Sequence, residues 1–241
     1  MPLIGKNAIV TGGASGIGLA TCRRLARDGV GIGVWDIDYA GAQRTAAELV
    51  ASGARAVACN VDVSARTQID AGVERVHAEL GKVQILVNNA GMTSFRPFLE
   101  VTEAEWERVM FVNLKSMFLC TQAVLPGMRA RRWGRIVNIS SGAARGAGGI
   151  GVHYNASKAG MEGLTRGYAA RLVKAGITVN AVAPSLIDTD MMSARRDQYV
   201  ARIPLGRMGT PAEVAQVVLM VMGNEYMTGQ TVQLNGGTSF I

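Results

Sequence analysis

The sequence predicts an α/β fold, a single doubly wound domain spanning residues 1–241 around a parallel sheet of about seven strands with helices on both faces. Apolar, β-rich runs alternate with helical patterns along the whole chain. Because each helix returns the chain across the sheet, this alternation favours parallel strands that are covered on both faces. No linker, composition break or internal repeat divides the 241 residues, so one domain is the economical prediction.

The elements follow one another in regular order. Strands are expected at residues 7–12, 31–36, 54–63, 83–91, 134–141, 176–184 and 228–237. Helices are expected at residues 16–29, 40–53, 65–81, 102–128, 153–174 and 211–222. Thr102 and Glu105 can form a capping box at the start of the long helix 102–128. Thr210, Pro211 and Glu213 supply an N-cap, a first-turn proline and a box glutamate for the last helix.

Composition limits the kinds of site that the chain can carry. Thirty glycines make up about 12% of the residues, well above the roughly 7% average. Such a surplus suits tight turns and close approach of the backbone to a ligand. Cys22, Cys59 and Cys120 are far apart and stand near no histidine. We therefore expect buried structural thiols and no metal site.

The formal charge of +7 can attract nucleic acid, an acidic carrier protein or an anionic cofactor. The densest basic run holds Arg129, Arg131, Arg132 and Arg135, and we interpret it as a solvated helix end. No nucleic-acid-binding motif accompanies it. No apolar run reaches the roughly 18 residues of a membrane span, and the N-terminus has no signal-peptide pattern. We therefore expect a soluble, cytoplasmic protein with no nucleic acid or membrane partner.

The first strand runs into the glycine-rich stretch TGGASGIG, residues 11–18. Gly12, Gly16 and Gly18 stand between a strand and a helix, where glycine permits positive φ and lets a phosphate approach the backbone. The N-terminus of the following helix supplies free N–H groups and partial positive charge for a pyrophosphate. The spacing is TGxxxGxG and not the usual GxGxxG, but its position between strand and helix favours a dinucleotide site over a simple turn.

Asp36 ends the second strand, where a carboxylate can accept hydrogen bonds from an adenosine ribose and would repel a 2′-phosphate. No basic residue follows Asp36 directly or replaces Ser15 in the glycine loop. The sequence therefore predicts that NAD is preferred over NADP. Later strands end in further polar or small residues that suit the neighbourhood of a cofactor: Asp62, Val63, Asn88, Asn89, Ala90 and Gly91.

The stretch YNASK places Tyr154 and Lys158 one helical turn apart on a common face. A phenol with a pKa near 10 is a poor base at pH 7, and a neighbouring lysine cation is expected to lower that pKa. Tyr154 can then remove a proton from an alcohol or donate one to a ketone oxygen. Ser141, thirteen residues earlier at the end of the fifth strand, can hold the substrate oxygen.

Taken together, TGGASGIG, NNAG, FVNL, NISS, YNASK and the C-terminal LNGG resemble the short-chain dehydrogenase/reductase family over essentially the whole chain. Within that family the sequence is most similar to the 3-oxoacyl-carrier-protein reductase group. The resemblance implies a Rossmann fold, an NAD(P) cofactor, a small alcohol or ketone substrate and a homotetramer. The family's usual Pro-Gly is Pro184-Ser185 here, which puts the local loop shape in doubt.

The resemblance also assigns roles by matched position. Tyr154 would be the acid and base, Lys158 its electrostatic partner, Ser141 the catalytic serine in preference to Ser140, and Asn113 the anchor of a water in the proton relay. The residues expected to contact the cofactor are Gly12, Ser15, Gly16, Ile17, Gly18, Asp36, Ile37, Asp62, Val63, Asn89, Ala90, Gly91, Tyr154, Lys158, Pro184, Ile187 and Thr189.

Two segments are expected to shape the substrate pocket: residues 142–153 and a lid at about residues 185–205. Arg145 is the one charge in the first segment and either meets an anionic substrate group or, as we favour, faces solvent. The lid segment contains Met191, Met192, Arg195, Arg196 and Tyr199, and its methionines suit an apolar substrate or belong to an ordinary core.

The leading functional prediction is an NAD-dependent secondary-alcohol dehydrogenase or ketone reductase. An alternative is a 3-oxoacyl-thioester reductase whose basic run at 129–135 meets an acidic acyl carrier protein, which we favour less because such biosynthesis commonly uses NADPH and Asp36 opposes it. A third reading, from another class, is a catalytically silent dinucleotide-binding module. That reading predicts loss of the chemical residues, whereas Asn113, Ser141, Tyr154 and Lys158 are all present.

Overall fold

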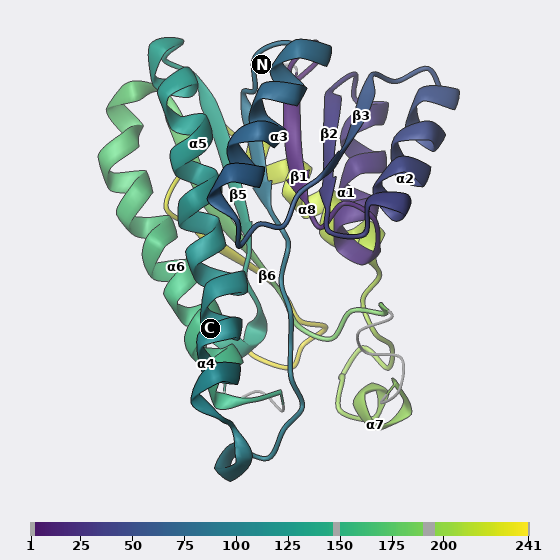
Figure 1. Cartoon of the computed structure of the whole chain (residues 1–241). Helices are drawn as coiled ribbons and strands as arrows, with labels where there is room; N and C mark the ends of the chain where they lie inside the picture. The colour runs from purple at the N-terminus through teal and green to yellow at the C-terminus, as the bar shows by residue number, and fades with distance from the viewer. Residues whose placement is uncertain (1–2, 147–149, 190–195, 241) are drawn as a thin grey trace.

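The computed structural model describes residues 3–146, 150–189 and 196–240 (Figure 1). Its centre is a seven-stranded sheet in the order β3-β2-β1-β4-β5-β6-β7, in which all neighbouring strands run parallel. The strands are β1 (Asn7–Thr11), β2 (Gly31–Asp36), β3 (Ala56–Asn60), β4 (Ile85–Asn88), β5 (Gly134–Ile139), β6 (Ile177–Pro184) and β7 (Thr231–Leu234). The parallel sheet with flanking helices confirms the predicted fold class.

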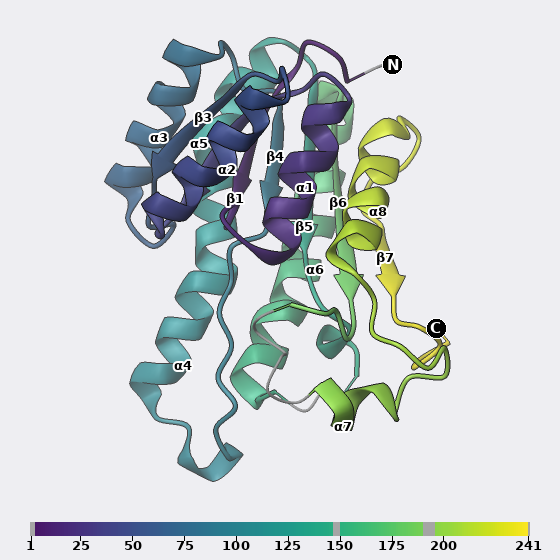
Figure 2. The same cartoon turned by 90° about the vertical axis from the view of Figure 1, so that its right-hand side faces the viewer.

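Helices cover both faces of the sheet. One face carries α1 (Gly16–Arg27), α2 (Tyr39–Ala51) and α8 (Pro211–Gly223), which Figure 2 views from the front. The other carries α3 (Arg66–Glu79), α5 (Ser116–Ala130) and α6 (Val152–Leu172). Within β1, Ala8 and Val10 enter the first hydrophobic cluster and Ile9 enters the second. This alternation is what a strand buried on both faces requires.

The order of the strands reverses beside β1, because β2 and β3 lie on one side of it and β4 to β7 on the other. Connections therefore leave the carboxyl ends of β1 and β4 in opposite directions and open a crevice between them. Two short helices, α4 (Glu103–Met110) and α7 (Arg196–Val200), lie at this end of the molecule (Figure 2). Three short 3₁₀ helices are η1 (Phe98–Glu100), η3 (Gly142–Ala144) and η4 (Val173–Ala175).

The helix expected at 102–128 is not one continuous α-helix. A π-helical turn, η2 (Phe111–Lys115), separates α4 from α5 and contains Asn113. The capping box predicted at its start forms only in part: the Glu105 backbone N–H donates to Thr102 Oγ1 at 3.2 Å, but the Glu105 carboxylate binds Ser94 and Arg96. The second predicted box, at the start of α8, is complete.

The described residues contain one helical run, Glu103–Arg131, that is long and apolar enough to cross a membrane by length and composition alone. Cys120, Val124 and Met128 of this run pack into the hydrophobic cluster under the sheet. Other apolar side chains of the run, Trp106 and Phe118, are exposed, so the run is only partly buried. Cys22, Cys59 and Cys120 are free and buried, as predicted.

Two arginines of the basic run, Arg131 after α5 and Arg135 on β5, are used inside the fold, so the run is not simply a solvated helix end, which corrects our interpretation. Arg135 is 4% exposed, and its Nε donates to the Met222 carbonyl at the end of α8 at 3.1 Å. Its Nη2 meets Glu225 at 3.2 Å, and its guanidinium stacks over Trp133. Arg131 Nη2 donates to the Val83 carbonyl at 2.7 Å.

Replacing Arg135 with methionine is expected to lower the free energy of unfolding by about 2 kcal/mol, because it leaves buried carbonyl oxygens without a donor. Arg129→Met removes an exposed cation from the same run and should change stability by less than about 0.5 kcal/mol. Urea unfolding of the two variants and the parent protein measures both effects. Equal stability of the two variants would contradict a structural role for Arg135.

Candidate functional site

The glycine-rich loop between β1 and α1 can be built only from glycine at its critical positions. Gly12 and Gly16 have φ values of +66° and +51°, in the left-handed region that other residues avoid. A Cβ atom on Gly18 would stand 1.9 Å from the Gly12 carbonyl oxygen. The loop therefore folds back on the first turn of α1 without any side chain between them, as the sequence suggested.

The N-terminus of α1 is open towards the crevice. Ser15 is its N-cap residue but makes no side-chain capping bond, and the first turn holds no acidic residue. The N–H groups of this turn are therefore left for an external acceptor, and the helix dipole adds partial positive charge. This is the arrangement that favours a phosphate group.

Asp36 lies at the end of β2 and faces the same crevice. Its Oδ2 accepts from the Ala14 backbone N–H at 2.9 Å, and its Oδ1 accepts from the Asp38 backbone N–H at 3.0 Å. These bonds fix the carboxylate against the glycine loop. Asp38 instead caps α2 by accepting from the Gly41 N–H at 3.0 Å.

The residues after β3 and β4 form the next part of the wall. Asp62 Oδ1 accepts from the Ser64 backbone N–H at 2.8 Å and from the Ser64 hydroxyl at 2.7 Å. Asn89 Nδ2 donates to the carbonyls of Thr11 at 2.9 Å and Gly12 at 3.1 Å. Asn89 thus braces the glycine loop from the neighbouring strand. Asn88 is turned away from the crevice and donates to Asn138 Oδ1 within the core at 2.8 Å.

Ser141, Tyr154 and Lys158 meet where β5 ends and α6 begins. The Tyr154 hydroxyl and the Ser141 side chain share a hydrogen bond. Lys158 Nζ donates to the Ile139 carbonyl at 2.8 Å and lies 5.7 Å from the centroid of the Tyr154 ring. Ser140 instead donates to the Lys158 backbone carbonyl at 3.2 Å, so the two adjacent serines have different partners.

Burial controls the protonation of this group. Tyr154 is 8% exposed and Lys158 is 4% exposed. Burial raises the pKa of Tyr154 above its ordinary value of 10.0, and the hydrogen bond to Ser141 opposes that rise only in part. Burial lowers the pKa of Lys158 from 10.5 to about 8. The net shift of the Tyr154 pKa is therefore upward, opposite to the direction expected from Lys158, because desolvation is the largest cause.

Asn113 stands behind this group on the π-helical turn and is fully buried. Its Nδ2 donates to the Met92 carbonyl at 3.0 Å and to Ser157 Oγ at 3.1 Å, and its Oδ1 accepts from the Met92 N–H at 2.8 Å. Ser157 in turn donates to the Tyr154 carbonyl at 2.8 Å. Asn113 thereby links the loop after β4 to the helix that carries Tyr154.

A cavity of about 890 Å³ joins these parts. Its wall contains the predicted catalytic and cofactor residues except Gly18 and Asn113, and it also lacks Asn88. Gly18 packs against the Gly12 carbonyl behind the wall, and Asn113 links two loops there. Thr189 approaches the glycine loop: a Cβ atom on Gly16 would stand 3.4 Å from Thr189 Cγ2. Pro184 ends β6 and Ile187 follows it, both on the same wall.

Several wall residues escaped the sequence prediction, and Met191, Met192 and Arg195 lie outside the described residues. Among the missed residues are those from α4, from the π-helical turn, and from β7 and the chain after it: Arg108, Phe111, Val112, Gln233, Asn235, Thr238 and Ser239. The last four could have been found, since the carboxyl end of every parallel strand faces the same edge of the sheet. Arg145 also lies on the wall, with a side chain that is 37% exposed.

Comparison with known proteins agrees with this geometry. A family model described as short chain dehydrogenase matches residues 6–200. The 3-oxoacyl-[acyl-carrier-protein] reductase of Pseudomonas aeruginosa is 42% identical, covering 98% of this chain and 98% of that protein. A (2S)-[(R)-hydroxy(phenyl)methyl]succinyl-CoA dehydrogenase subunit of Thauera aromatica is 38% identical, over 99% and 98%. A crystal structure of a 3-oxoacyl-[acyl-carrier protein] reductase with bound NAD from Brucella melitensis has a TM-score of 0.90 at 34% identity, covering 98% of this chain and 93% of that one.

The lowered pKa of Lys158 predicts that this residue costs stability. Between about pH 8 and 10.5 the folded protein binds fewer protons than the unfolded chain, so the cost is full below pH 8 and is lost as the pH rises to 10.5. Lys158→Met should therefore raise the free energy of unfolding by about 1–2 kcal/mol at pH 7, after the lost bond to Ile139 is counted. The gain should be smaller at pH 10.5.

Urea unfolding at pH 7 and at pH 10.5 without cofactor measures this difference. Lys174→Met, at an exposed lysine, is the matched control and should show no comparable gain at either pH. A Lys158→Met variant that is less stable than the parent at pH 7, or whose effect is the same at both pH values, would contradict the prediction.

Proposed function

The chain belongs to the short-chain dehydrogenase family, and on that premise we propose that it interconverts a secondary alcohol and a ketone with NAD(H), with Tyr154 as acid and base. Family and relatives make it an oxidoreductase that acts on CH–OH groups or ketones with NAD(P). The observation that carries the finer proposal is the group formed by Ser141 with the buried Tyr154 and Lys158, which opens on the same cavity as the glycine loop.

The cavity suits a dinucleotide along its length. Gly12 and Gly16 leave the backbone open for a pyrophosphate at the N-terminus of α1, and Asp36 suits the adenosine ribose. Further along the wall, Ile187 and Thr189 are assigned to the nicotinamide carboxamide. When bound, the nicotinamide ring supplies a hydride acceptor for alcohol oxidation and a hydride donor for ketone reduction. We assign the remaining cofactor contacts to the other predicted residues on the wall.

In the proposed reaction Tyr154 takes the proton of the substrate hydroxyl during alcohol oxidation and gives a proton to the substrate oxygen during ketone reduction. The Ser141 hydroxyl holds that oxygen in place. For a base the phenol must ionise, and its burial opposes this. The Lys158 Nζ, 5.7 Å from the centroid of the Tyr154 ring, supplies a stabilising positive charge, and it keeps its proton more readily once an anion forms beside it. Asn113 completes the group: we propose that it anchors the water of the proton relay and positions Tyr154 through Ser157.

NAD is the proposed cofactor in preference to NADP. The Asp36 carboxylate is fixed by two backbone N–H groups and would repel a 2′-phosphate on the adenosine ribose. Ile37, which follows it on the wall, offers no cation to bind that phosphate.

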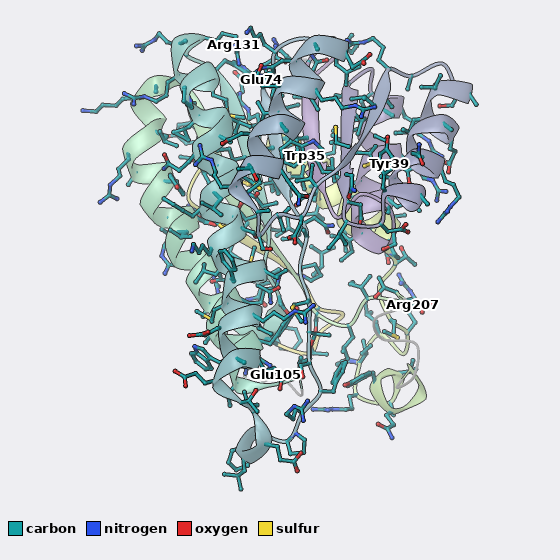
Figure 3. The ribbon with its side chains drawn as sticks, viewed as in Figure 1. Trp35, Tyr39, Glu74, Glu105, Arg131 and Arg207 are labelled. Carbon is teal, nitrogen blue, oxygen red and sulfur yellow. The ribbon has the colours of Figure 1, made fainter. Side chains whose placement is uncertain are left out.

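Reduction of a 3-oxoacyl thioester is the second candidate function, and the reductases among the relatives favour it. Asp36 does not separate the two functions, because the Brucella reductase has bound NAD. The basic run at residues 129–135 gives little support to docking of a carrier protein beside the cavity. Figure 3 places Arg131 at the end of the molecule opposite Glu105 of α4, and Arg135 is buried. A catalytically silent binding module is the least favoured function, since every chemical residue is present.

We further propose a single domain with a lid at residues 185–205, a homotetramer and a cytoplasmic location. Tyr199, Ile203 and Met208 form a small separate hydrophobic cluster in and beside the lid. Exposed Trp106 on α4 and Phe118 on α5 lie in the segment 102–128, whose helices the family resemblance suggests for a subunit interface. Free, buried cysteines are what a reducing compartment maintains.

Replacing Tyr154 with phenylalanine should lower kcat about 10²–10⁴-fold, because it removes the group that transfers the proton. NADH formation from NAD and a panel of cyclic, aryl and acyl secondary alcohols measures the rate. Binding of NADH, followed by its fluorescence, should stay within about threefold, since the aromatic ring remains and only the hydroxyl is lost. Parent-like turnover by the variant would disprove the acid and base assignment, and NADH binding without turnover by the parent on any alcohol, ketone or 3-oxoacyl thioester would favour the silent module.

Removing the charge of Asp36 should shift the cofactor preference. In Asp36→Ala and Asp36→Asn the ratio of kcat/KM with NADP to that with NAD should rise about 10–100-fold, as the repulsion and the ribose hydrogen bonds are lost. Asp38→Asn, which changes charge next to α2 but off the cavity wall, should leave the ratio unchanged. A parent enzyme that prefers NADP would refute the assignment directly.

A further inference from the structure

The charges on the cavity wall are segregated. Among the described residues the wall acids are Asp36 and Asp62, both at the proposed adenosine end after β2 and β3. The wall arginines, Arg108, Arg145 and Arg202, come from α4, from the turn after β5 and from the chain after α7. The part of the wall beyond the glycine loop is therefore cationic, and a negatively charged group fits there better than a neutral one.

Arg145 is held on this wall by a buried carboxylate. Its Nε donates to Glu162 Oε2 at 2.9 Å, and Glu162 is 4% exposed. Glu162 lies on α6 one turn beyond Lys158 and two turns beyond Tyr154, so the same helix carries the reacting phenol and the anchor of the arginine. The Arg145 side chain is thus tied to the reacting group by a rigid element.

The backbone of Arg145 is fixed as well. Ser141 Oγ accepts from the Ala143 N–H at 3.2 Å, and the Arg145 N–H donates to the Gly142 carbonyl at 3.3 Å. The Gly146 N–H donates to the same carbonyl at 3.0 Å. A compact turn therefore connects Ser141 to Arg145 over four residues, and both ends of it face the cavity.

The terminal nitrogens of the Arg145 guanidinium remain available to a ligand. Of the side-chain nitrogens of Arg145, only Nε donates a hydrogen bond to a described residue. Nη1 and Nη2 are not among the buried polar atoms that lack a partner. Their N–H groups form a planar fork that matches the two oxygens of a carboxylate. Glu162 neutralises the net charge of Arg145, but the guanidinium keeps its directional N–H donors. Arg108 and Arg202 form no ion pair with any described residue, so they supply the net positive charge of this part of the wall.

We propose that the substrate carries a carboxylate, and that Arg145 binds it while Ser141 and Tyr154 hold the reacting oxygen. This inference rests on the proposed function and narrows it to hydroxy acids and oxo acids. Arg145 is then a specificity residue: it selects the charged substrate and takes no part in the transfer of the proton.

The test compares substrates that differ in charge but hardly in size. Oxo acids with the ketone at carbon 3, 4, 5 or 6, beginning with acetoacetate, are reduced with NADH beside their primary amides, beginning with acetoacetamide. For the chain length that fits, kcat/KM of the parent for the acid should exceed that for the amide about 10–100-fold, the value of a charged hydrogen-bonded pair. A 3-oxoacyl-CoA thioester is the third arm and tests whether the anion recognised is a phosphate of a carrier.

Variants then assign the preference to one residue. Arg145→Gln should raise KM for the acid about 10–100-fold and leave kcat/KM for the amide within about threefold. Arg145→Lys should retain part of the preference, since it keeps the charge and loses the fork. Arg166→Gln removes an exposed arginine one turn further along α6 and is the control for net charge, with no change for either substrate.

A direct titration keeps the inference separate from the proposed function. The enzyme with bound NADH is titrated with each acid and amide, and binding is read from NADH fluorescence.

Turnover without a preference for the acid, or an equal loss for acid and amide in Arg145→Gln, would overturn the inference and leave the proposed function standing. If no oxo compound is reduced, the proposed function fails for this class, and acid binding that weakens only in Arg145→Gln still supports the carboxylate site. A thioester that surpasses all acids and is unaffected by Arg145→Gln would overturn the inference.

Discussion

Thr11 and Asn89 join the carboxyl ends of β1 and β4 where the two connections leave in opposite directions, and the site depends on this junction. Thr11 Oγ1 accepts from the backbone N–H groups of Asn89 at 3.0 Å and Ala90 at 2.9 Å, while Asn89 Nδ2 donates to the carbonyls of Thr11 and Gly12. Backbone groups that the sheet can no longer pair are satisfied there by two side chains. The glycine loop and the loop after β4 are therefore held at a fixed separation, and a Cβ atom on Gly18 would stand 2.6 Å from Asn89 Nδ2.

On the other side of the crevice, α6 presents Tyr154, Lys158 and Glu162 at four-residue intervals, all of them buried. Burying an ammonium and a carboxylate opposes folding, and the chain offsets this with the Ile139 carbonyl for Lys158 and the Arg145 guanidinium for Glu162. In exchange the helix fixes three charged or reactive groups relative to one another. A site whose groups are buried and preorganised in this way strengthens electrostatic interactions with a reacting anion.

The arginines of the chain have two different roles. Arg131 and Arg135 bind backbone carbonyls at the ends of other elements and so serve the fold. Arg108 and Arg202 remain unpaired among the described residues on the cavity wall, where their charge is available to a ligand. The net charge of +7 therefore says little by itself, because a surface run and a cavity lining contribute to it alike.

The sequence by itself determined the architecture and the edge of the sheet at which the site lies. Alternating strands and helices require a parallel sheet, and Gly12, Asp36 and Ser141 are recognisable because each follows a buried strand. The tertiary structure decided what depends on burial and on contacts distant in sequence. Only it separates the exposed Arg129 from the buried Arg135, shows that desolvation raises the pKa of Tyr154, and diverts Glu105 from its capping box to Ser94 and Arg96. The pairing of Arg145 with Glu162 belongs to the same class, since seventeen residues of chain separate two side chains that the fold brings to 2.9 Å. Local sequence spacing determines which helix or strand a residue occupies. Its charge state and its partners depend on how far the folded chain buries it away from water.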